Sequence, residues 1–251
     1  MGHGFIDRSS RLDSHVHRLD ARTKIIVALL FVVLEVSIPP QHLLTFVIYA
    51  GLLLWTVALS HLPLSLVLKR ALMVLPFSAL VALGLPFVRG GETILFCGIH
   101  LSVAGLWILV GTTLKSMLGV VAFILLVATT PFNRLLDGLR GLGVPIIFVD
   151  MIALTYRYLH ILIEEAIRLR RAAIARGYAP KWLPQAIIVG KLVGNLFVRS
   201  YERAERVYGA MHLRGYNGQL PTSAFSPFPV HERLVLAFMI LILITVRLLL
   251  Q

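Results

Sequence analysis

Residues 101–128 read LSVAGLWILVGTTLKSMLGVVAFILLVA, and Lys115 is the only charged side chain among them. A helix crosses a hydrocarbon core of about 30 Å with about 20 apolar residues, so this run is long enough to span a membrane. An ammonium group that faced lipid at mid-membrane would cost on the order of 3 kcal/mol. We therefore expect Lys115 to lie close to a membrane interface or, alternatively, to make a polar contact within a protein complex.

The rest of the chain has the composition of a membrane protein. Hydrophobic residues make up 58% of the 251 residues and charged residues only 14%, whereas about a quarter of the residues in a soluble domain are charged. The net charge of +12 is interpreted first as a topology signal, so a nucleic-acid partner is not expected. Cys97 is the single cysteine, which excludes an intrachain disulfide and a CxxC metal site.

Further apolar runs cover residues 25–38, 43–59, 66–87 and 234–250, and Pro76 and Pro86 interrupt the third of them. Together with residues 101–128 they predict about five transmembrane helices. Pro39 and Pro40 mark a turn between the first two runs, because proline lacks an N–H and restricts the residue before it. The first run is short for one crossing, so its helix is expected to tilt or to begin earlier, near Arg22.

The distribution of Lys and Arg orients these helices. Five of these residues lie in residues 1–24 and fourteen in residues 129–233, whereas the opposite side holds only Arg89 and Arg247. Because basic residues are enriched on the cytoplasmic side, the N-terminus and the long insert are predicted to be cytoplasmic. No cleavable signal peptide is expected, because the first 24 residues contain no apolar core. The predicted organisation is a cytoplasmic segment 1–24, four transmembrane helices in 25–128, a cytoplasmic coupling domain 129–230 and a C-terminal transmembrane helix 231–251.

The insert is predicted to contain three helices, two of them long and amphipathic. A short first helix starts with Thr130 as its N-cap and Pro131 at the first helical position. The second follows Pro145, and its apolar residues repeat at spacings of three and four; its first half, 146–154, is apolar enough to lie in the membrane interface. The third can occupy residues 182–213. The predicted fold class is an all-α integral membrane protein with a cytoplasmic domain of three helices.

Both long helices of the insert end in Arg, Gly and Tyr. The sequence reads Ala-Arg-Gly-Tyr at residues 175–178 and Leu-Arg-Gly-Tyr at residues 213–216, 38 positions later. A glycine directly after a helix adopts the left-handed conformation without a Cβ penalty, and a cation in the last turn complements the helix dipole. One such end is ordinary helix capping. Two matched ends indicate a pair of equivalent docking points, and hence a partner with two equivalent grooves.

Several short motifs also occur in an order that is typical of one family. Residues 17–24 read HRLDARTK, with Ala21 where the family usually has proline. The other motifs are Thr129-Thr130-Pro131 through Val144-Pro145, Arg157-Tyr158 through Ala166, and Arg199-Ser200-Tyr201-Glu202-Arg203-Ala204. In this order they resemble the transmembrane coupling subunit, or T component, of energy-coupling factor transporters. Residues 5–20 are most similar to the cobalt-uptake, CbiQ-type branch of that family.

The resemblance implies an energy-coupling subunit of an ATP-driven importer in a bacterial inner membrane. Its expected partners are two cytosolic ABC-type ATPases and a separate substrate-binding membrane subunit, which the resemblance to the cobalt-uptake branch implies is cobalt-specific. The residues implied to dock the ATPases are Ala175, Arg176, Gly177, Leu213, Arg214 and Gly215. Tyr178 and Tyr216 are expected to support the coupling helices, and Gly190 and Gly194 to allow close helix contact.

The sequence contains no nucleotide site of its own. It lacks a G-x-x-x-x-G-K-[ST] loop, so ATP hydrolysis is expected in the partners and the chain is not predicted to be an enzyme. The nine histidines form no HExxH or Cys/His cluster, so no metal ligand and no cofactor are assigned. Glu164 and Glu165 have arginines at helical spacing and are interpreted as an ion-paired surface instead of catalytic carboxylates.

The main alternative is a self-contained secondary transporter. Such proteins carry functional charges within their spans and often consist of repeated halves. In this chain Glu35 and Lys115 are nearly the only charges within the apolar runs, and five spans do not divide evenly. The sequence therefore favours the coupling subunit over the secondary transporter.

Overall fold

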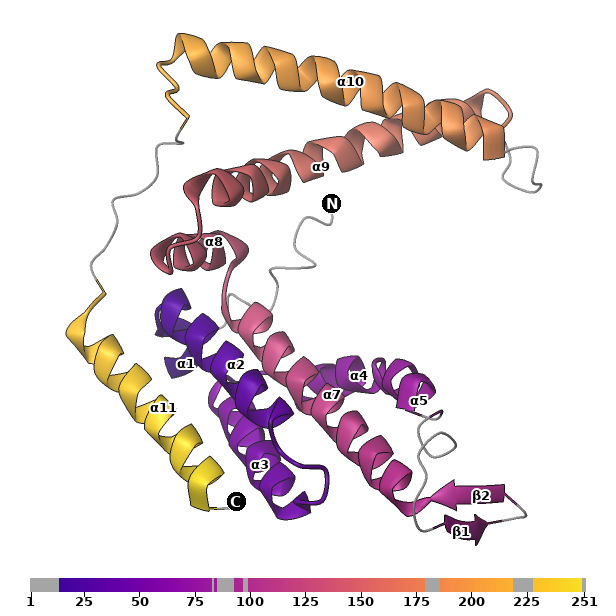
Figure 1. Cartoon of the computed structure of the whole chain (residues 1–251). Helices are drawn as coiled ribbons and strands as arrows, with labels where there is room; N and C mark the ends of the chain where they lie inside the picture. Colours follow the sequence, from indigo (N-terminus) through magenta and orange to yellow (C-terminus); the bar gives the residue numbers. More distant parts are fainter. Residues whose placement is uncertain are drawn as a thin grey trace. The chain divides into compact units, whose positions relative to one another are not determined.

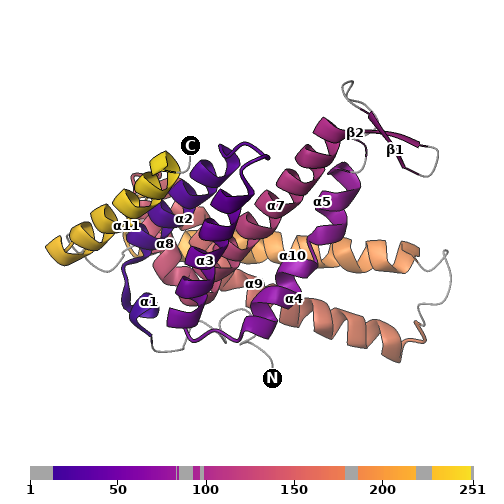
Figure 2. The same cartoon turned by 90° about the horizontal axis from the view of Figure 1, so that it is seen from below.

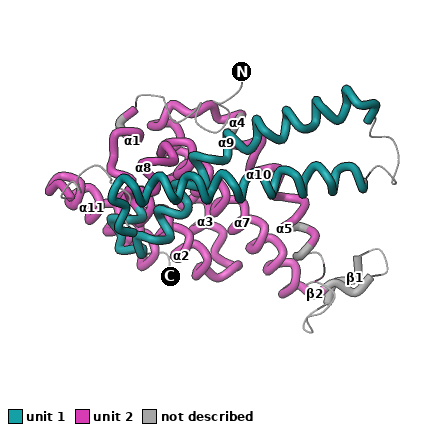
Figure 3. The backbone as a smooth tube through the Cα atoms, turned by 90° about the horizontal axis from the view of Figure 1, so that it is seen from above, with its two compact units in different colours: residues 1, 139–225 teal, residues 2–138, 226–251 magenta. Residues whose placement is uncertain are grey.

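Figure 1 shows the computed structural model of the chain, which describes residues 14–82, 84, 93–96, 99–178, 186–218 and 228–249. The chain divides into two compact units, coloured separately in Figure 3. The small unit comprises residues 139–225, and the large unit comprises residues 2–138 and 226–251. The boundary between them falls inside a short helix, α8 (Phe132–Gly141).

The large unit is a helical bundle built around its longest helix. The helices α2 (Ala21–Val36), α3 (Leu43–Leu59), α4 (Leu64–Leu72) and α5 (Leu75–Ala82) all pack against α7 (Val103–Thr129), as Figures 1 and 2 show. On its other side α2 packs against α11 (Val230–Leu249), and the one-turn helix α1 (His15–Arg18) precedes it. Phe31, Tyr49, Leu118 and Leu243, one from each of α2, α3, α7 and α11, belong to one buried apolar cluster.

The first two apolar runs form helices close to their predicted bounds. The helix α2 begins at Ala21, because the Asp20 carboxylate accepts a hydrogen bond from the Arg22 N–H at 3.0 Å and so caps it. This confirms the expectation that the first helix starts earlier than its apolar run. The helix α3 occupies the same residues as the second run, Leu43–Leu59.

The third apolar run does not form one continuous helix. Its first part is divided into α4 and α5, with Met73 and Val74 in the turn between them. Pro76 has no N–H to donate to Leu72, so the regular helical ladder fails at this point. The Val74 carbonyl instead accepts hydrogen bonds from Phe77 and Ser78, each at 3.1 Å. Residues 85–92, which include the end of this run, lie outside the described residues.

A β-hairpin departs from the all-α prediction. The strands β1 (Thr93–Phe96) and β2 (Ile99–Ser102) pair in antiparallel register, with Thr93 opposite Ser102. The last two residues of β2 belong to the apolar run that the sequence assigns wholly to a helix. The Ser102 hydroxyl then accepts a hydrogen bond from the Gly105 N–H at 3.4 Å, and α7 starts at Val103. Cys97, between the strands, lies outside the described residues.

The small unit contains the end of α8 and two long helices, α9 (Ile146–Ala175) and α10 (Ala186–Leu213), which lie side by side and run in opposite directions (Figure 3). Pro145 precedes α9 as predicted, and α10 ends at the predicted residue. The predicted start of the third insert helix, Trp182, lies outside the described residues. The Thr130 cap of α8 is wrong: α8 starts at Phe132, and the buried Thr130 hydroxyl has no hydrogen-bond partner among the described residues.

Two of the described helices are long and apolar enough to cross a membrane by length and composition. They are α7 and α9, and α3 is a shorter apolar helix. In α9 the apolar character belongs to the N-terminal part, because five charged side chains follow between Glu164 and Arg171. By length and composition the whole of α7 is a candidate membrane span, whereas in α9 only the N-terminal part is apolar.

Candidate functional site

The end of α9 is a Schellman motif centred on Gly177. The Tyr178 N–H donates to the Ala173 carbonyl at 3.1 Å, and the Gly177 N–H donates to the Ile174 carbonyl at 3.0 Å. Gly177 has a φ of +84°, in the left-handed region that glycine occupies without strain. The motif satisfies the last helical carbonyls and leaves Arg176 as the C-cap residue.

The end of α10 has the same backbone geometry. The Tyr216 N–H donates to the Met211 carbonyl at 3.0 Å, and the Gly215 N–H donates to the His212 carbonyl at 3.0 Å. Gly215 has a φ of +81°, within three degrees of Gly177. The two Arg-Gly ends that the sequence singles out are therefore one structural motif that occurs twice.

The two ends also present the same side-chain positions to solvent. In each, the residue before Arg, the Arg and the Gly are exposed, whereas the Tyr that follows is half-buried. Leu213 has 92% of its surface exposed, an unusual fraction for a large apolar side chain. Each end is thus a projecting tip with an apolar or small residue beside a cation, a shape that suits insertion into a groove.

The surroundings of the two tips differ. At the end of α10 three rings follow one another at a spacing of four residues. Tyr208 and His212 lie edge to face with centroids 4.5 Å apart, and His212 and Tyr216 lie edge to face with centroids 6.4 Å apart. No ring pair of this kind is found at the α9 tip in the described part of the chain.

An ion cluster holds α9 and α10 together where they pack. Glu165 on α9 accepts hydrogen bonds from Arg199 on α10 at 2.5 Å and from Arg168 on its own helix at 2.6 Å. Glu165 is buried although it is charged. Glu164 adds a looser contact with Arg168 at 3.8 Å. The predicted ion-paired surface is confirmed, and the structure adds that one of its carboxylates joins the two helices.

Hydrogen bonding from Arg168, then from Arg199, lowers the pKa of the Glu165 carboxyl below its ordinary value. Both bonds stabilise the charged form, so Glu165 stays ionised at neutral pH. We call the Glu165–Arg199 ion pair the clamp between α9 and α10. It is present at physiological pH and weakens only in acid.

The clamp also determines how far apart the two tips are. Arg176 lies eleven residues beyond Glu165, and Arg214 lies fifteen residues beyond Arg199, in opposite directions along the antiparallel pair (Figure 3). At 1.5 Å per residue these arms are about 16 and 22 Å long, which separates the tips by roughly 25 to 40 Å, depending on the crossing angle. Two separate binding grooves are needed to hold both tips at once.

The small residues proposed to support the coupling helices show no close contact. A Cβ at Gly190 or at Gly194 on α10 would meet no heavy atom of the described chain within 4 Å. Neither glycine is therefore needed for the packing of α10 on α9. Both stay available to a partner, as do the exposed apolar side chains Val193 and Phe197 beside them.

Sequence reasoning missed a buried polar cluster at one end of the large unit. Glu232, at the start of α11, accepts hydrogen bonds from the Asp20 N–H at 3.2 Å and from the Thr23 hydroxyl at 3.0 Å. The Lys24 ammonium donates to the Thr129 carbonyl at 3.0 Å and to the His17 carbonyl at 3.2 Å. The motif at residues 17–24 thus joins the first, fourth and last apolar runs. No local pattern signals contacts between residues this far apart.

At the other end of α2, two cations bond to its C-terminal carbonyls. Lys115 of α7 donates to the Val36 carbonyl at 2.7 Å, and Arg247 of α11 donates to the Ser37 carbonyl at 2.9 Å. Cations in this position complement the negative end of the helix dipole. Lys115 therefore lies level with the end of α2 and has a polar contact within the chain. Glu35 is fully buried close by, and neither carboxylate oxygen has a hydrogen-bond partner among the described residues.

Among the described residues there is no group of three or more His, Cys, Asp and Glu side chains that could hold a metal ion. The His17 ring is hydrogen-bonded to the Ser14 hydroxyl at 2.7 Å, and the His160 ring lies edge to face with Tyr156. The matched helix tips are the feature on which the function proposed below rests.

Comparison with known proteins relates most of the chain to one family. Residues 13–224 match the family described as CbiQ, cobalt transport protein. The chain is 30% identical over 213 residues to the cobalt transport protein CbiQ of Rhodobacter capsulatus, a match that covers 81% of each chain. It is 28% identical over 230 residues to the energy-coupling factor transporter transmembrane protein EcfT of Bacillus subtilis, covering 82% of each. A shorter match, 39% identical over 90 residues, covers 36% of this chain and 33% of the nickel permease LarQ of Lactiplantibacillus plantarum.

Proposed function

We propose that this chain, which belongs to the CbiQ family of cobalt transport proteins, is the energy-coupling membrane subunit of a multisubunit ATP-driven importer. Its relatives identify it as a component of a cobalt or energy-coupling factor type of transport system. The observation that carries the coupling role is the pair of matched, exposed Arg-Gly tips on α9 and α10.

The tips dock two cytosolic ABC-type ATPases, one per tip. Arg176 and Arg214 each bring a guanidinium with five donors, which can bridge a carboxylate and carbonyls in a protein groove. Ala175 and Leu213 supply the small or apolar contact beside the cation, and Gly177 and Gly215 turn the chain away from the groove. Two copies of one ATPase fit this arrangement, because the two tips share one backbone geometry.

Movement of the ATPases reaches the membrane through the crossing of α9 and α10. A change in the separation of two grooves on an ATPase pair changes the separation of the tips, which are held at opposite ends of the helix pair. The Glu165 clamp with Arg199 keeps the helices together while their angle changes. A separate substrate-binding membrane subunit rests on the exposed apolar side chains of the two helices and follows that change.

The proposed topology has five membrane-spanning segments: α2, α3, the α4–α5 pair, α7 and α11. It places the N-terminus and residues 129–230 on the cytoplasmic side of a bacterial inner membrane, because fourteen Lys and Arg residues lie in 129–233. Although α9 is long and apolar enough for a span, its C-terminal half is charged, which favours a cytoplasmic amphipathic helix.

Cobalt ions are the proposed substrate, carried through the partner subunit and not through this chain. The support is the family description and the cobalt transport relative from Rhodobacter capsulatus. The nickel permease relative makes nickel the ion to test beside it. Competition between the two ions in uptake by the assembled complex distinguishes them.

Affinity purification of the chain from its native membrane, followed by mass spectrometry, tests the coupling role. We expect two copies of an ATPase and one small membrane protein in the purified complex. Uptake by proteoliposomes should require all of these subunits and ATP. Recovery of the chain alone, or metal uptake by the chain alone in the absence of ATPases, would contradict the proposal and favour a secondary transporter.

A further inference from the structure

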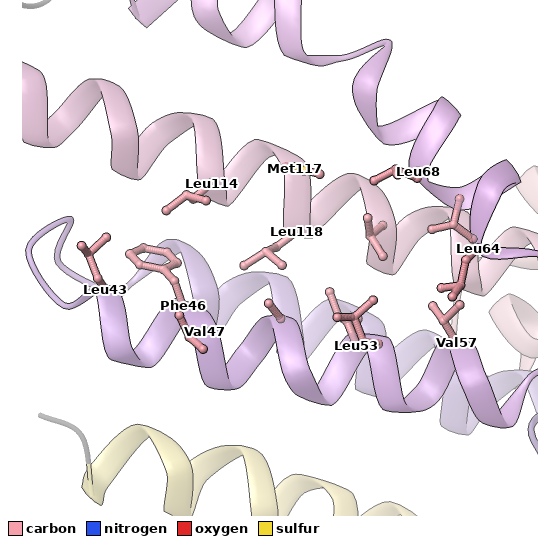
Figure 4. A pocket seen from close by; sticks show the side chains of 14 residues that line it. Leu43, Phe46, Val47, Leu53, Val57, Leu64, Leu68, Leu114, Met117 and Leu118 are labelled. Carbon is pink, nitrogen blue, oxygen red and sulfur yellow. The ribbon is translucent and has the colours of Figure 1, made fainter.

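A long apolar groove runs between α3 and α7 in the large unit and ends at α4 (Figure 4). Its volume is about 590 Å³. Figure 4 shows Phe46 and Leu53 of α3 facing Leu114 and Leu118 of α7 across it. We call this feature the α3–α7 groove. Along α3 it extends from Leu43 to Val57, which is about 21 Å at 1.5 Å per residue.

The lining of the groove excludes water and accepts hydrocarbon. Every lining side chain is Leu, Phe, Val, Ala or Met, and side chains along it such as Val47 and Leu64 are 66% and 57% exposed. Apolar cavities of this kind stay dry, and an empty one loses the dispersion contacts of its walls. In the proposed membrane location the groove opens toward lipid, so the available filler is a hydrocarbon chain.

A lipid chain and a helix of a partner subunit are the two apolar occupants to compare for this groove. The cations at its α4 end favour the lipid, because an anionic headgroup complements them. One leaflet of the hydrocarbon core is about 15 Å thick, half of about 30 Å, so an acyl chain that enters at the α4 end extends along most of the groove but not all of it.

Two cations stand beside the α4 end of the groove. Lys69 and Arg70 lie in the last turn of α4 and are exposed, whereas Val67 and Leu68 of the same helix line the groove. No ion pair of Lys69 or Arg70 with any of the described residues is found. The helix thus presents an apolar face to the groove and two unpaired positive charges next to it.

We propose that the α3–α7 groove binds one acyl chain of an anionic phospholipid, whose phosphate group is held by Lys69 and Arg70. The proposed topology places this end of the groove at the cytoplasmic leaflet, where anionic lipids attract basic residues. The lipid fills the gap that α3 and α4 leave against α7. The proposal goes beyond the coupling role and does not depend on the ATPases.

Spin-labelled lipids in nanodiscs of phosphatidylcholine test this site on the full chain. The wild-type chain should immobilise labelled phosphatidylglycerol more strongly than labelled phosphatidylcholine. Ala50→Phe, which fills the groove from α3, should abolish the immobilised component. Ala58→Phe is the matched control on the same helix, since Ala58 is exposed and does not line the groove, and it should bind lipid as the wild type does.

A second pair of substitutions separates the headgroup from the chain. Lys69→Gln and Arg70→Gln leave the groove intact, and each should lower the preference for phosphatidylglycerol about fivefold, since one basic residue near an anionic surface contributes about 1 kcal/mol. These residues are exposed, so the variants fold even if Ala50→Phe does not. An unchanged preference in the double variant, an unchanged immobilised fraction in Ala50→Phe, or a partner's helix cross-linked inside the groove overturns the proposal.

Discussion

The two units are held together in different ways. In the large unit, buried polar groups join segments that are far apart in the sequence: Glu232 bonds to Asp20 and Thr23, and Lys24 bonds to the Thr129 carbonyl. In the small unit, α9 and α10 are joined across their contact by the Glu165–Arg199 pair, and large apolar side chains such as Val193 and Phe197 remain exposed.

This difference indicates that the two units have different mechanical properties. The buried hydrogen bonds of Glu232 and Lys24 favour one arrangement of helices, so this end of the large unit has the character of a fixed scaffold. A pair of long helices with one ionic clamp and exposed apolar faces can change its crossing angle at little cost, and it is completed by partners. The proposed coupling role requires both properties, a stable membrane part and a part that moves.

Removing a buried polar partner in the large unit should have the largest effect on stability. Glu232→Ala leaves the Asp20 N–H and the Thr23 hydroxyl without their acceptor in a buried site. We expect a loss of about 2 to 3 kcal/mol in the free energy of unfolding, the usual value for hydrogen bonds to a charged group. Thermal unfolding in detergent measures it. Glu202→Ala is the control, because Glu202 makes only an exposed contact at 3.9 Å with Arg206; an equal loss in both variants would refute the scaffold interpretation.

A smaller effect of opposite sign is expected at Glu35. This carboxylate is fully buried without a hydrogen-bond partner among the described residues, a state that costs free energy. Glu35→Met keeps the side-chain length and removes the polar group, so it should raise the free energy of unfolding by about 1 to 2 kcal/mol. The same thermal assay applies. Destabilisation by Glu35→Met would show that the carboxylate has an essential partner.

At the tips, glycine substitutions should affect only local structure. Gly177→Ala and Gly215→Ala force a side chain into the left-handed region, at a cost of about 1 kcal/mol each. Gly190→Ala is the matched control on α10, where open space and helical geometry predict a gain of about 0.5 to 1 kcal/mol. Hydrogen exchange at the Tyr178 and Tyr216 amides reports the opening of each tip. Equal exchange in all variants would argue against the Schellman geometry.

The smallest effect on stability is expected at the clamp. The pKa of Glu165 is lowered in the folded chain, so the clamp contributes stability above the ordinary carboxyl pKa of 4.5 and loses it as the pH falls through the lower folded value. Spin labels on the two tips should show a narrower distance distribution at neutral pH than in acid. Glu165→Gln should show the broad distribution at every pH. If neither acid nor Glu165→Gln altered the distance distribution, apolar packing alone would hold α9 and α10 at their crossing.

Much of the helical layout could be predicted because its signals are local. Pro39 and Pro40 end one run before α3, and the Arg-Gly pairs end α9 and α10 where the sequence indicates. The break between α4 and α5, at Met73 and Val74, lies just before Pro76, which the sequence marks as an interruption of the third run. The first two residues of the apolar run at 101–128 belong to β2. They pair with β1, and the hydrophobicity of the run does not signal this pairing.

The geometry of the site was only partly visible in the sequence. The tips were found because capping depends on neighbouring residues, whereas the Glu165–Arg199 pair spans 34 positions and depends on how two helices cross. The bonds of Glu232 to Asp20 and Thr23 span more than 200 positions, so they required the folded structure. The bond of Lys115 to the Val36 carbonyl spans 79 positions, so the sequence alone does not name this partner.

The most direct measurement of the coupling claim is the affinity of the purified chain for its ATPase pair with each tip reversed in charge. Arg176→Glu and Arg214→Glu should each weaken binding, by about 2 to 5 kcal/mol if the guanidinium is buried and paired in its groove. The double variant should lose ATPase binding and ATP-dependent uptake altogether. Arg171→Glu, an equal change of charge on an exposed position of α9, is the control and should bind as the wild type does. Unchanged ATPase affinity in the double variant would contradict the account.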